Sequence, residues 1–207
     1  MTPAAEKAVK VIRQMGGTVH TSEAIRKGVH PRDLYALRDR GALDQITRGV
    51  YRLTELAAIS NPDLVTVASR APHAVICLIS ALSYHNLTSQ VPHEVSIAIV
   101  RGSRIPRIHY PPVAVHKFAP ESFRAGIEEH GIDGVKVRVY APEKTLADCF
   151  KFRNKMGMDV VLEALKLYKE REKFDAAALL KYARICRVEK VIRPYLEAIG
   201  WTRKKEN

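Results

Sequence analysis

The residues best suited to a chemical task lie in one short stretch, ITRGVYRL at residues 46–53. Arg48 and Gly49 interrupt two runs of β-branched and aromatic residues, which predicts two strands joined by a tight turn with a cation at its tip. A guanidinium at the end of a β-hairpin can contact a phosphate or enter the minor groove of DNA. The alternative is a plain hairpin with a solvated arginine, so the interpretation depends on the neighbouring elements.

The first two of three helices predicted before this hairpin lie at the start of the chain. Apolar residues at helical spacing predict an amphipathic helix over 4–15, which Gly16 ends. Thr21 or Ser22 can cap a second, short helix over 22–27. These two helices precede the helix that carries the candidate DNA-contacting residues.

A third helix begins at Pro31, which suits a first helical turn, and Gly41 is placed to end it. At about 100° per residue, its leucines share one buried face. Arg32 lies on the opposite face, flanked by Tyr35 and Arg40. Long hydrogen-bond donors near the N-terminal half of an exposed face are typical of a helix that contacts base edges.

Three short helices followed by a two-stranded ribbon are the layout of a winged helix-turn-helix. This context favours the DNA-reading interpretation of Arg48. We predict a DNA-binding domain over 1–56 and a second domain over 57–207, with the linker at residues 57–59 and Asn61–Pro62.

The second domain is expected to mix helices and strands and to become helical after Ala141. Segments 94–100, 113–118 and 135–141 have the composition of strands. The last helix is expected to be kinked or divided at Pro194. The predicted fold class is therefore α+β: an N-terminal winged helix-turn-helix followed by a mixed α+β domain ending in a helical C-terminal part. Helices are also expected over 63–71 and 79–87. After Ala141, one helix is indicated by an apolar stripe of Met158, Val161, Leu162, Leu165 and Tyr168.

Charge favours a polyanionic partner. Thirty-four Lys and Arg against 22 Asp and Glu give a formal charge of +12 and a pI near 9.8. The excess is +4 over residues 1–56, +2 over 57–140 and +6 over 141–207. Basicity thus extends beyond the predicted DNA-binding domain. The C-terminal helices could also approach the DNA backbone, and the alternative, which we favour, is a solvated helical surface of mixed charge.

Motifs for catalysis and for cofactors are missing from the sequence. It contains neither GxxxxGK[ST] nor GxGxxG, no GxSxG and no HExxH, and its eight histidines are scattered. We expect no cofactor, no bound metal and no enzymatic activity. The odd number and wide spacing of Cys77, Cys149 and Cys186 favour buried thiols in a reducing compartment. With no apolar run of about 18 residues and no signal-peptide pattern, a cytoplasmic protein without membrane association is expected.

One enzymatic alternative rests on acidic residues around the segment VKVRVYA. Asp133, Glu143 and Lys144 loosely resemble the acidic–x–Lys pattern of a metal-dependent nuclease. The residue that should separate the acid from the lysine is absent. A proline and an acid in a helical first turn explain Pro142-Glu143-Lys144 equally well.

Three segments together resemble the AbiEi-type antitoxins of bacterial abortive-infection, type IV toxin–antitoxin systems. They are GALDQITRGVYRL, ISALSYHNLTSQVPHEVSIAI and VYAPEKTLADCFKFRNKMGMDVVLEAL, in the expected order over nearly the whole chain. The resemblance implies a winged helix that binds inverted repeats in its own operon promoter and represses transcription. It also implies a C-terminal domain that antagonises a nucleotidyltransferase-like toxin, often without a lasting complex, and aids cooperative DNA binding.

Six DNA-contacting positions follow from this resemblance. The resemblance identifies no functional residue in the C-terminal domain. A winged helix with one wing covers about one half-site, so two copies are expected to bind a repeat, with possible self-association on DNA. The six positions are Arg32, Tyr35 and Arg38 on the third helix and Thr47, Arg48 and Arg52 on the wing.

Other interpretations are a winged-helix transcription factor without a toxin partner, the metal-dependent nuclease of a defence system, and a module whose winged helix binds protein. A toxin-like gene immediately downstream would separate the first of these from an antitoxin. Metal-dependent cleavage of plasmid or RNA would identify the second.

Overall fold

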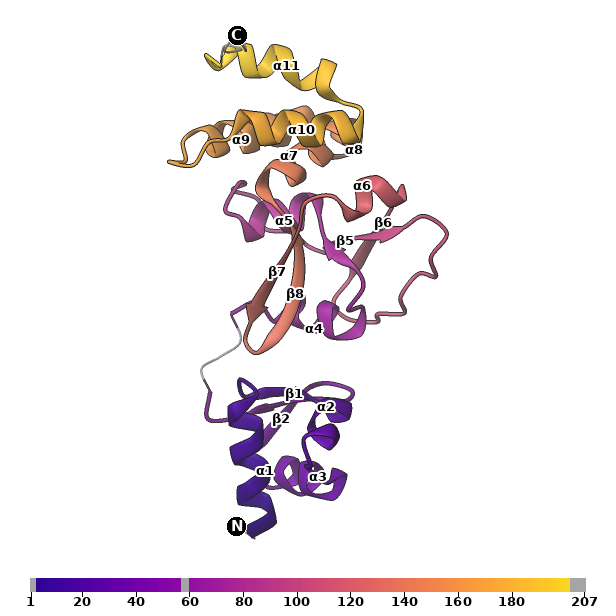
Figure 1. The fold of residues 1–207 in the computed structure, drawn as a ribbon, viewed down its shortest axis with the longest axis vertical. Helices are drawn as coiled ribbons and strands as arrows, with labels where there is room; N and C mark the ends of the chain where they lie inside the picture. Colours follow the sequence, from indigo (N-terminus) through magenta and orange to yellow (C-terminus); the bar gives the residue numbers. More distant parts are fainter. Residues whose placement is uncertain (1–2, 57–59, 202–207) are drawn as a thin grey trace. The chain divides into compact units, whose positions relative to one another are not determined.

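The computed structural model describes residues 3–56 and 60–201, and its fold is mixed α+β, as predicted (Figure 1). The chain divides into two compact units: residues 1–72 with 130–137, and residues 73–129 with 138–207. This division differs from the predicted 1–56 and 57–207, because a further helix and the tip of a later hairpin group with the N-terminal elements. The predicted linker residues 57–59 lie outside the described residues.

The first unit contains the three predicted helices and the predicted hairpin. A strand that the sequence did not predict, β1, pairs antiparallel with β3, so the sheet has the order β1-β3-β2. The elements are α1 (Pro3–Gln14), β1 (Thr18–His20), α2 (Thr21–Arg26), α3 (Pro31–Asp39), β2 (Leu43–Thr47), β3 (Val50–Leu53) and α4 (Pro62–Arg70).

Helical periodicity builds the core of this unit. Ala8 and Ile12 of α1 are buried together with Leu34 and Leu37 of α3. Each pair has a spacing of three or four residues, so each helix presents one apolar face to the core. The exposed faces of the helices are left to polar and charged side chains.

The cap of α2 differs from the prediction. Its N-cap is His20, and neither Thr21 nor Ser22 caps it. The Thr21 hydroxyl instead donates to the carbonyl of Gly49 in the β2–β3 turn (3.2 Å), as does the Thr21 backbone N–H (2.8 Å). The start of α2 is therefore attached to the turn of the hairpin.

The second unit is built around a five-stranded sheet with the order β6-β5-β4-β8-β7, whose β7–β8 hairpin tip belongs to the first unit. The predicted strands became β5, β6 and β8. The sequence missed β4, which has only two residues, and β7, whose segment IEEHGI lacks alternation. The elements up to the end of the sheet are β4 (Val75–Ile76), α5 (Leu78–Tyr84), β5 (Val95–Val100), β6 (Val113–Phe118), α6 (Pro120–Arg124), β7 (Ile127–Ile132) and β8 (Val135–Tyr140).

Helices follow Ala141, as predicted. In the apolar stripe of α9, Val161, Leu165 and Tyr168 are buried, but Leu162 is exposed, contrary to expectation. The last helix runs through Pro194 undivided. No helix among the described residues has the length and apolar character needed to cross a bilayer. These helices are α7 (Pro142–Lys151), α8 (Arg153–Met156), α9 (Met158–Lys169), α10 (Ala176–Cys186) and α11 (Glu189–Ala198).

Candidate nucleic-acid interface

The N-terminal end of α3 is fixed by its cap. The Nδ1 atom of His30 accepts a hydrogen bond from the backbone N–H of Arg32 (3.2 Å), and Pro31 occupies the first turn. This cap ends the preceding loop at a defined residue. The side chains of Arg32 and Tyr35 follow on the exposed face, with Tyr35 45% exposed.

Arg38 is tied to its neighbours on the same helix. Its guanidinium donates to Asp39 through Nε (2.9 Å) and Nη2 (2.7 Å), and it lies 5.4 Å from the centroid of the Tyr35 ring. The hydrogen bond to Asp39 raises the pKa of Arg38. Arg38 is half-buried, in keeping with its predicted place near the buried edge of the helix. It holds Tyr35 from one side, while its charge is already shared with a carboxylate.

The β2–β3 turn presents Arg48 to solvent. Gly49 has a φ of +79°, a conformation in which glycine avoids the steric cost of a side chain. The pairing of β2 with β3 shifts register between Gln45 and Thr47, which bends the strand just before the turn. The attachment of Thr21 to Gly49 then holds the turn against α2, so Arg48 projects from a braced support.

Thr47 has a partner that the sequence analysis missed. Its hydroxyl oxygen accepts a hydrogen bond from Nε of Arg70 at the end of α4 (2.7 Å). Arg70 is exposed, so it adds a cation beside the hairpin. No sequence signal indicated this contact, since 23 residues separate the two positions.

Arg52 does not fit its predicted place on the DNA-contacting surface. It is only 7% exposed, and Nη1 donates to the carbonyl of Asp133 (3.0 Å) and to the hydroxyl of Thr18 (3.2 Å). Its Nη2 lies 3.5 Å from Oδ1 of Asp133. The predicted two-stranded ribbon would have left one flank of β3 open. In the structure, β1 pairs along that flank and the hairpin tip bearing Asp133 binds the guanidinium.

Three arginines of the first unit remain available for a ligand: Arg32, Arg40 and Arg48. Each is exposed, and none has a side-chain hydrogen bond or ion pair with another described residue. They lie on α3, just after it, and at the turn attached to α2. Of the six predicted contact residues, Arg32, Tyr35 and Arg48 are thus exposed, Arg38 and Thr47 are partly engaged, and Arg52 is buried.

The acidic residues considered for a nuclease do not gather into one site. Asp133 lies in the first unit, where its carboxylate accepts hydrogen bonds from the backbone N–H and hydroxyl of Ser60 (2.9 Å each). Glu143, in the second unit, accepts a hydrogen bond from the hydroxyl of Tyr168. Within the part of the chain that the structure describes, no three His, Cys, Asp or Glu side chains form a group able to hold a metal ion.

Lys144 is buried instead of available. It and Asp148 are both 0% exposed, and Nζ lies 2.5 Å from Oδ2 of Asp148 one helical turn later. The ammonium also lies 4.1 Å from the centroid of the Tyr140 ring, and the thiol of Cys186 donates to the other carboxylate oxygen (3.2 Å). Burial raises the pKa of Asp148, and the adjacent ammonium opposes that shift. The network satisfies its own charges inside the core.

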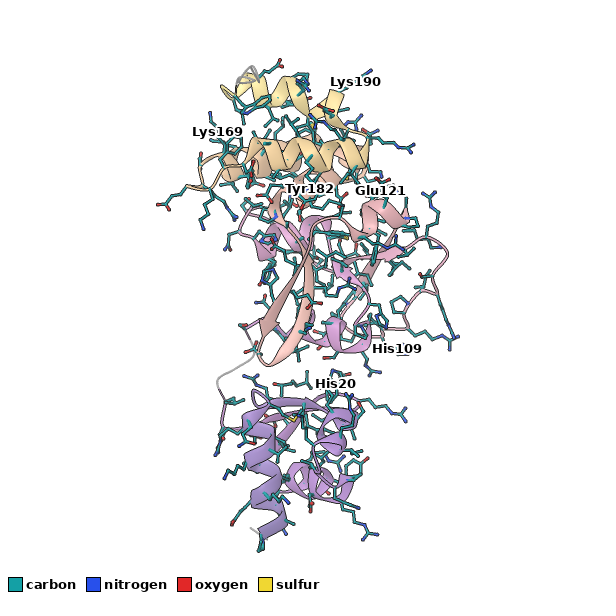
Figure 2. All side chains as sticks on the ribbon, in the orientation of Figure 1. His20, His109, Glu121, Lys169, Tyr182 and Lys190 are labelled. Atoms are coloured by element: carbon teal, nitrogen blue, oxygen red, sulfur yellow. The ribbon has the colours of Figure 1, made fainter. Side chains whose placement is uncertain are left out.

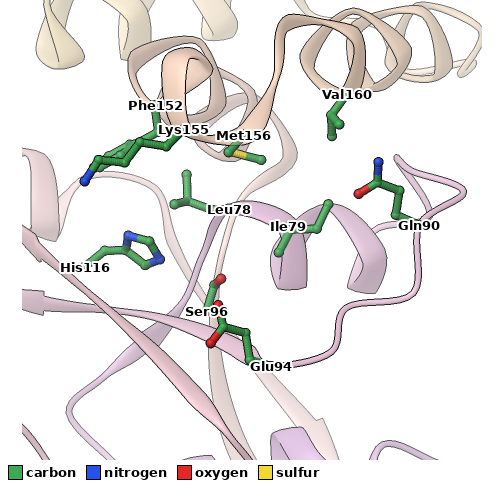
Figure 3. Close-up of a pocket in the computed structure, with 10 residues that line it drawn as sticks. All are labelled: Leu78, Ile79, Gln90, Glu94, Ser96, His116, Phe152, Lys155, Met156 and Val160. Carbon is green, nitrogen blue, oxygen red and sulfur yellow. The ribbon is translucent and has the colours of Figure 1, made fainter.

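A pocket of about 260 Å³ opens in the second unit (Figure 3). His116 lines it, and Nε2 of that ring is buried without a hydrogen-bond partner among the described residues. Burial, and next the cation of Lys155, lowers the pKa of His116, which favours a neutral ring. Ser96 and Glu94 also line the pocket, but no hydrogen bond joins Ser96 to His116. Ser96 and His116 therefore do not form the hydrogen-bonded nucleophile and base of a hydrolytic site.

Two comparisons with known proteins found a match for this chain. Residues 6–54 match the model of the AbiEi antitoxin family of transcriptional regulators, which confirms over this segment the resemblance found in the sequence. The matched segment covers all but the first three residues of α1, together with α2, α3 and both strands of the hairpin. No curated protein matches the chain.

A solved structure shares the fold. The crystal structure of the RV2827C protein from Mycobacterium tuberculosis aligns over 99% of this chain and 84% of that one, with a TM-score of 0.54 and 15% identity. At this identity the likeness concerns the fold alone. It extends through both units, whereas the family match ends at residue 54.

Proposed function

We propose that the first unit is a winged helix-turn-helix that binds double-stranded DNA, with α3 as the recognition helix and the β2–β3 hairpin as the wing. The observation that carries this proposal is the set of three exposed arginines without partners, Arg32, Arg40 and Arg48, on elements held by caps and backbone hydrogen bonds. An interface for a polyanion needs cations that are free of internal carboxylates and presented by rigid elements.

Each exposed side chain has its own role in this proposal. Arg32 and Tyr35, near the start of α3, contact base edges in the major groove. Arg48 contacts a phosphate or enters the minor groove from the wing. Arg38 positions the Tyr35 ring through the cation–π contact. Arg52 supports the wing from within the unit and contacts no DNA.

The biological role that we propose is repression of the protein's own operon together with neutralisation of a toxin. The match of residues 6–54 to AbiEi antitoxin regulators supports this role. The toxin would resemble a nucleotidyltransferase, and its neutralisation would need no lasting complex. Such a pair would act in phage defence in the cytoplasm, and the protein would work by binding, without catalysis.

The proposed operator is an inverted repeat that binds two copies of the protein. One recognition helix and one wing cover about one half-site, and a repeat presents two such sites related by symmetry. The second unit would then contribute to cooperative binding.

A titration against the protein's own upstream promoter tests the proposed DNA binding. The promoter fragment and a scrambled fragment of equal length and composition are titrated at two salt concentrations. We expect preference for the promoter at both. Equal affinity for both fragments would contradict the repressor role and leave a basic surface alone.

A second candidate function is a transcription factor with no toxin partner. The family match supports it, because that match ends at residue 54 and leaves the second unit unassigned. Co-expression with the adjacent gene separates the two functions. Rescue from growth arrest supports the antitoxin role, and a harmless adjacent gene together with promoter binding supports the transcription factor.

A further inference from the structure

The long connection between β5 and β6 carries a second set of unpartnered cations. These strands are parallel, in register from Val95 opposite Val113 to Val100 opposite Phe118. A parallel pair requires a crossover, which is usually a helix. Here residues 101–112 return without any helix or strand and extend outward beyond the edge strand β6 (Figure 1). Loops of this length without internal structure are commonly functional.

The loop is anchored only at its ends. The backbone N–H of Arg101 donates to the carbonyl of Phe118 (2.7 Å), and that of Val95 donates to the carbonyl of Pro112 (2.8 Å). Between these anchors, residues 104–110 make no hydrogen bond with another described residue. His109, labelled in Figure 2, marks this exposed part. The backbone leaves β5 and enters β6 at defined positions, and Arg104, Arg107 and Tyr110 between them are exposed.

The charge of this region has one sign. From residue 95 to residue 120 the sequence contains no aspartate or glutamate. Arg101, Arg104 and Arg107 are exposed, and none has a side-chain hydrogen bond or ion pair with another described residue. Arginines elsewhere in the second unit, such as Arg184 and Arg193, are paired with Glu189.

The spacing of the cations indicates a linear ligand. Arg101, Arg104 and Arg107 recur every third residue, and Tyr110 continues the same spacing. In an extended chain three residues span roughly 9–10 Å, so the guanidiniums are spread along the loop. A compact anion needs donors that converge on one point, whereas a polymer of phosphates needs donors in a row.

Tyr110 decides the kind of polyanion. Its ring is 72% exposed and follows the last of the three arginines. An exposed aromatic ring beside a row of cations suits a base that is free to stack on it. Bases of a duplex are already stacked on each other. Surface membrane binding instead favours an amphipathic helix with a broad apolar face, which this loop lacks.

We propose that the loop of residues 101–110 is a binding site for single-stranded nucleic acid, in which the three arginines contact successive phosphates and Tyr110 stacks on a base. This site is distinct from the duplex-binding role proposed for the first unit. RNA and single-stranded DNA share the required chemistry, and the test below separates them.

The test measures binding of the full-length protein to labelled single-stranded RNA, single-stranded DNA and duplex DNA of one mixed sequence by fluorescence anisotropy. Arg104→Gln/Arg107→Gln should weaken single-strand binding and lower its salt slope by about 1.4. Lys181→Gln/Lys190→Gln on α10 and α11, with the same change in net charge, should leave both values unchanged. Tighter binding of RNA than of DNA identifies a contact to the 2′-hydroxyl, and equal binding identifies phosphates and bases alone.

The stacking contact has a separate test. Tyr110→Ala should weaken single-strand binding about 5- to 150-fold, whereas Tyr110→Phe, which keeps the ring, should stay within about two-fold of the original chain. Thermal unfolding of each variant confirms that the protein remains folded, as expected for exposed loop positions.

Several outcomes overturn the proposal. In the first, the loop variants and the control variants lose single-strand affinity equally. In the second, the loop variants lose affinity for duplex DNA alone. In the third, the protein binds vesicles with anionic lipid and no nucleic acid. Arg48→Ala, on the wing, serves as the reverse control and should weaken duplex binding only. A protein that binds single strands but no duplex would refute the function proposed for the first unit while supporting the loop.

Discussion

Cations play opposite roles at the α3–hairpin surface and at the start of α7. Arg32 and Arg48 are exposed, and neither side chain has a hydrogen bond or ion pair with another described residue. His30 caps the helix that carries Arg32, and Thr21 is hydrogen-bonded to the turn that carries Arg48. Lys144 is fully buried and committed to Asp148 at 2.5 Å. The two arginines are available to pair with an anionic ligand, whereas the lysine is already paired with a carboxylate inside the fold.

Arg52 shows which property distinguishes an available cation from one bound within the fold. It belongs to the hairpin, as Arg48 does, yet its guanidinium donates hydrogen bonds to Asp133 and Thr18. Position in a motif therefore does not by itself leave an arginine available for a ligand. The decisive property is whether the fold supplies an internal acceptor.

The largest expected effect concerns the buried pair. Lys144→Ala removes the ammonium and leaves Asp148 buried without its cation, so the free energy of unfolding should fall by about 3–5 kcal/mol. Urea unfolding followed by circular dichroism measures this loss. Lys151→Ala, at an exposed position of the same helix, is the matched control and should change stability by less than about 0.5 kcal/mol.

The double variant Lys144→Met/Asp148→Leu sharpens this comparison. With both charges replaced by apolar side chains, most of the lost stability should return. If the double variant is as unstable as Lys144→Ala, the pair does more than balance its own charges, and the account of the α7 region is wrong.

Arg52→Ala should cost about 2–3 kcal/mol of stability, because it removes buried donors to the Asp133 carbonyl and the Thr18 hydroxyl. Under conditions where the variant stays folded, its DNA affinity should match that of the original chain. Thermal unfolding and anisotropy with duplex DNA measure the two quantities. A loss of DNA affinity at full stability would return Arg52 to the interface.

Arg32→Ala should act on specificity and leave stability unchanged. If Arg32 contacts a guanine, affinity for the promoter should fall by about 1–3 kcal/mol, and affinity for scrambled DNA should fall much less. Competition titrations with both fragments measure the difference. Equal losses on the two fragments would make Arg32 a phosphate contact.

The smallest expected effect is a pH-dependent change in stability at α9. Glu163 accepts hydrogen bonds from Ser89 Oγ (2.6 Å), Ser89 N (3.1 Å) and Thr88 Oγ1 (3.1 Å), and chiefly the Ser89 bonds lower its pKa. A lowered pKa in the folded state stabilises the protein above the carboxyl's ordinary pKa, and this contribution is lost as the pH falls through the lowered value.

Glu163→Gln should accordingly reduce stability by about 1 kcal/mol at pH 7. The difference from the original chain should shrink as the pH falls below the ordinary range of a glutamate. Urea unfolding at several pH values measures it. A difference that stays constant down to about pH 3 would show that the carboxylate charge plays no part.

Local signals predicted much of the first unit. Apolar periodicity located α1 and α3, Pro31 and Gly41 marked the limits of the third helix, and Gly49 marked the turn. These features depend on residues close together in the chain. The exposure of Arg32, Tyr35 and Arg48 follows from the same local geometry.

Long-range contacts account for what the sequence did not predict. The burial of Arg52 depends on Asp133, 81 residues away, and the contact of Thr47 depends on Arg70. β1 has three residues and acquires its structure by pairing with β3. The full burial of Lys144 likewise requires the tertiary core around α7, which helical periodicity alone does not define.

The most direct test of DNA binding by the α3–hairpin surface is the salt dependence of promoter binding by Arg48→Ala. The variant is compared with the original chain and with Lys7→Ala, an exposed cation of α1. We predict that Arg48→Ala weakens binding to promoter and scrambled DNA alike and lowers the salt slope by about 0.9, one phosphate contact. Lys7→Ala should leave the slope unchanged. An unchanged slope for Arg48→Ala would remove the wing from the interface and contradict the proposed mode of DNA binding.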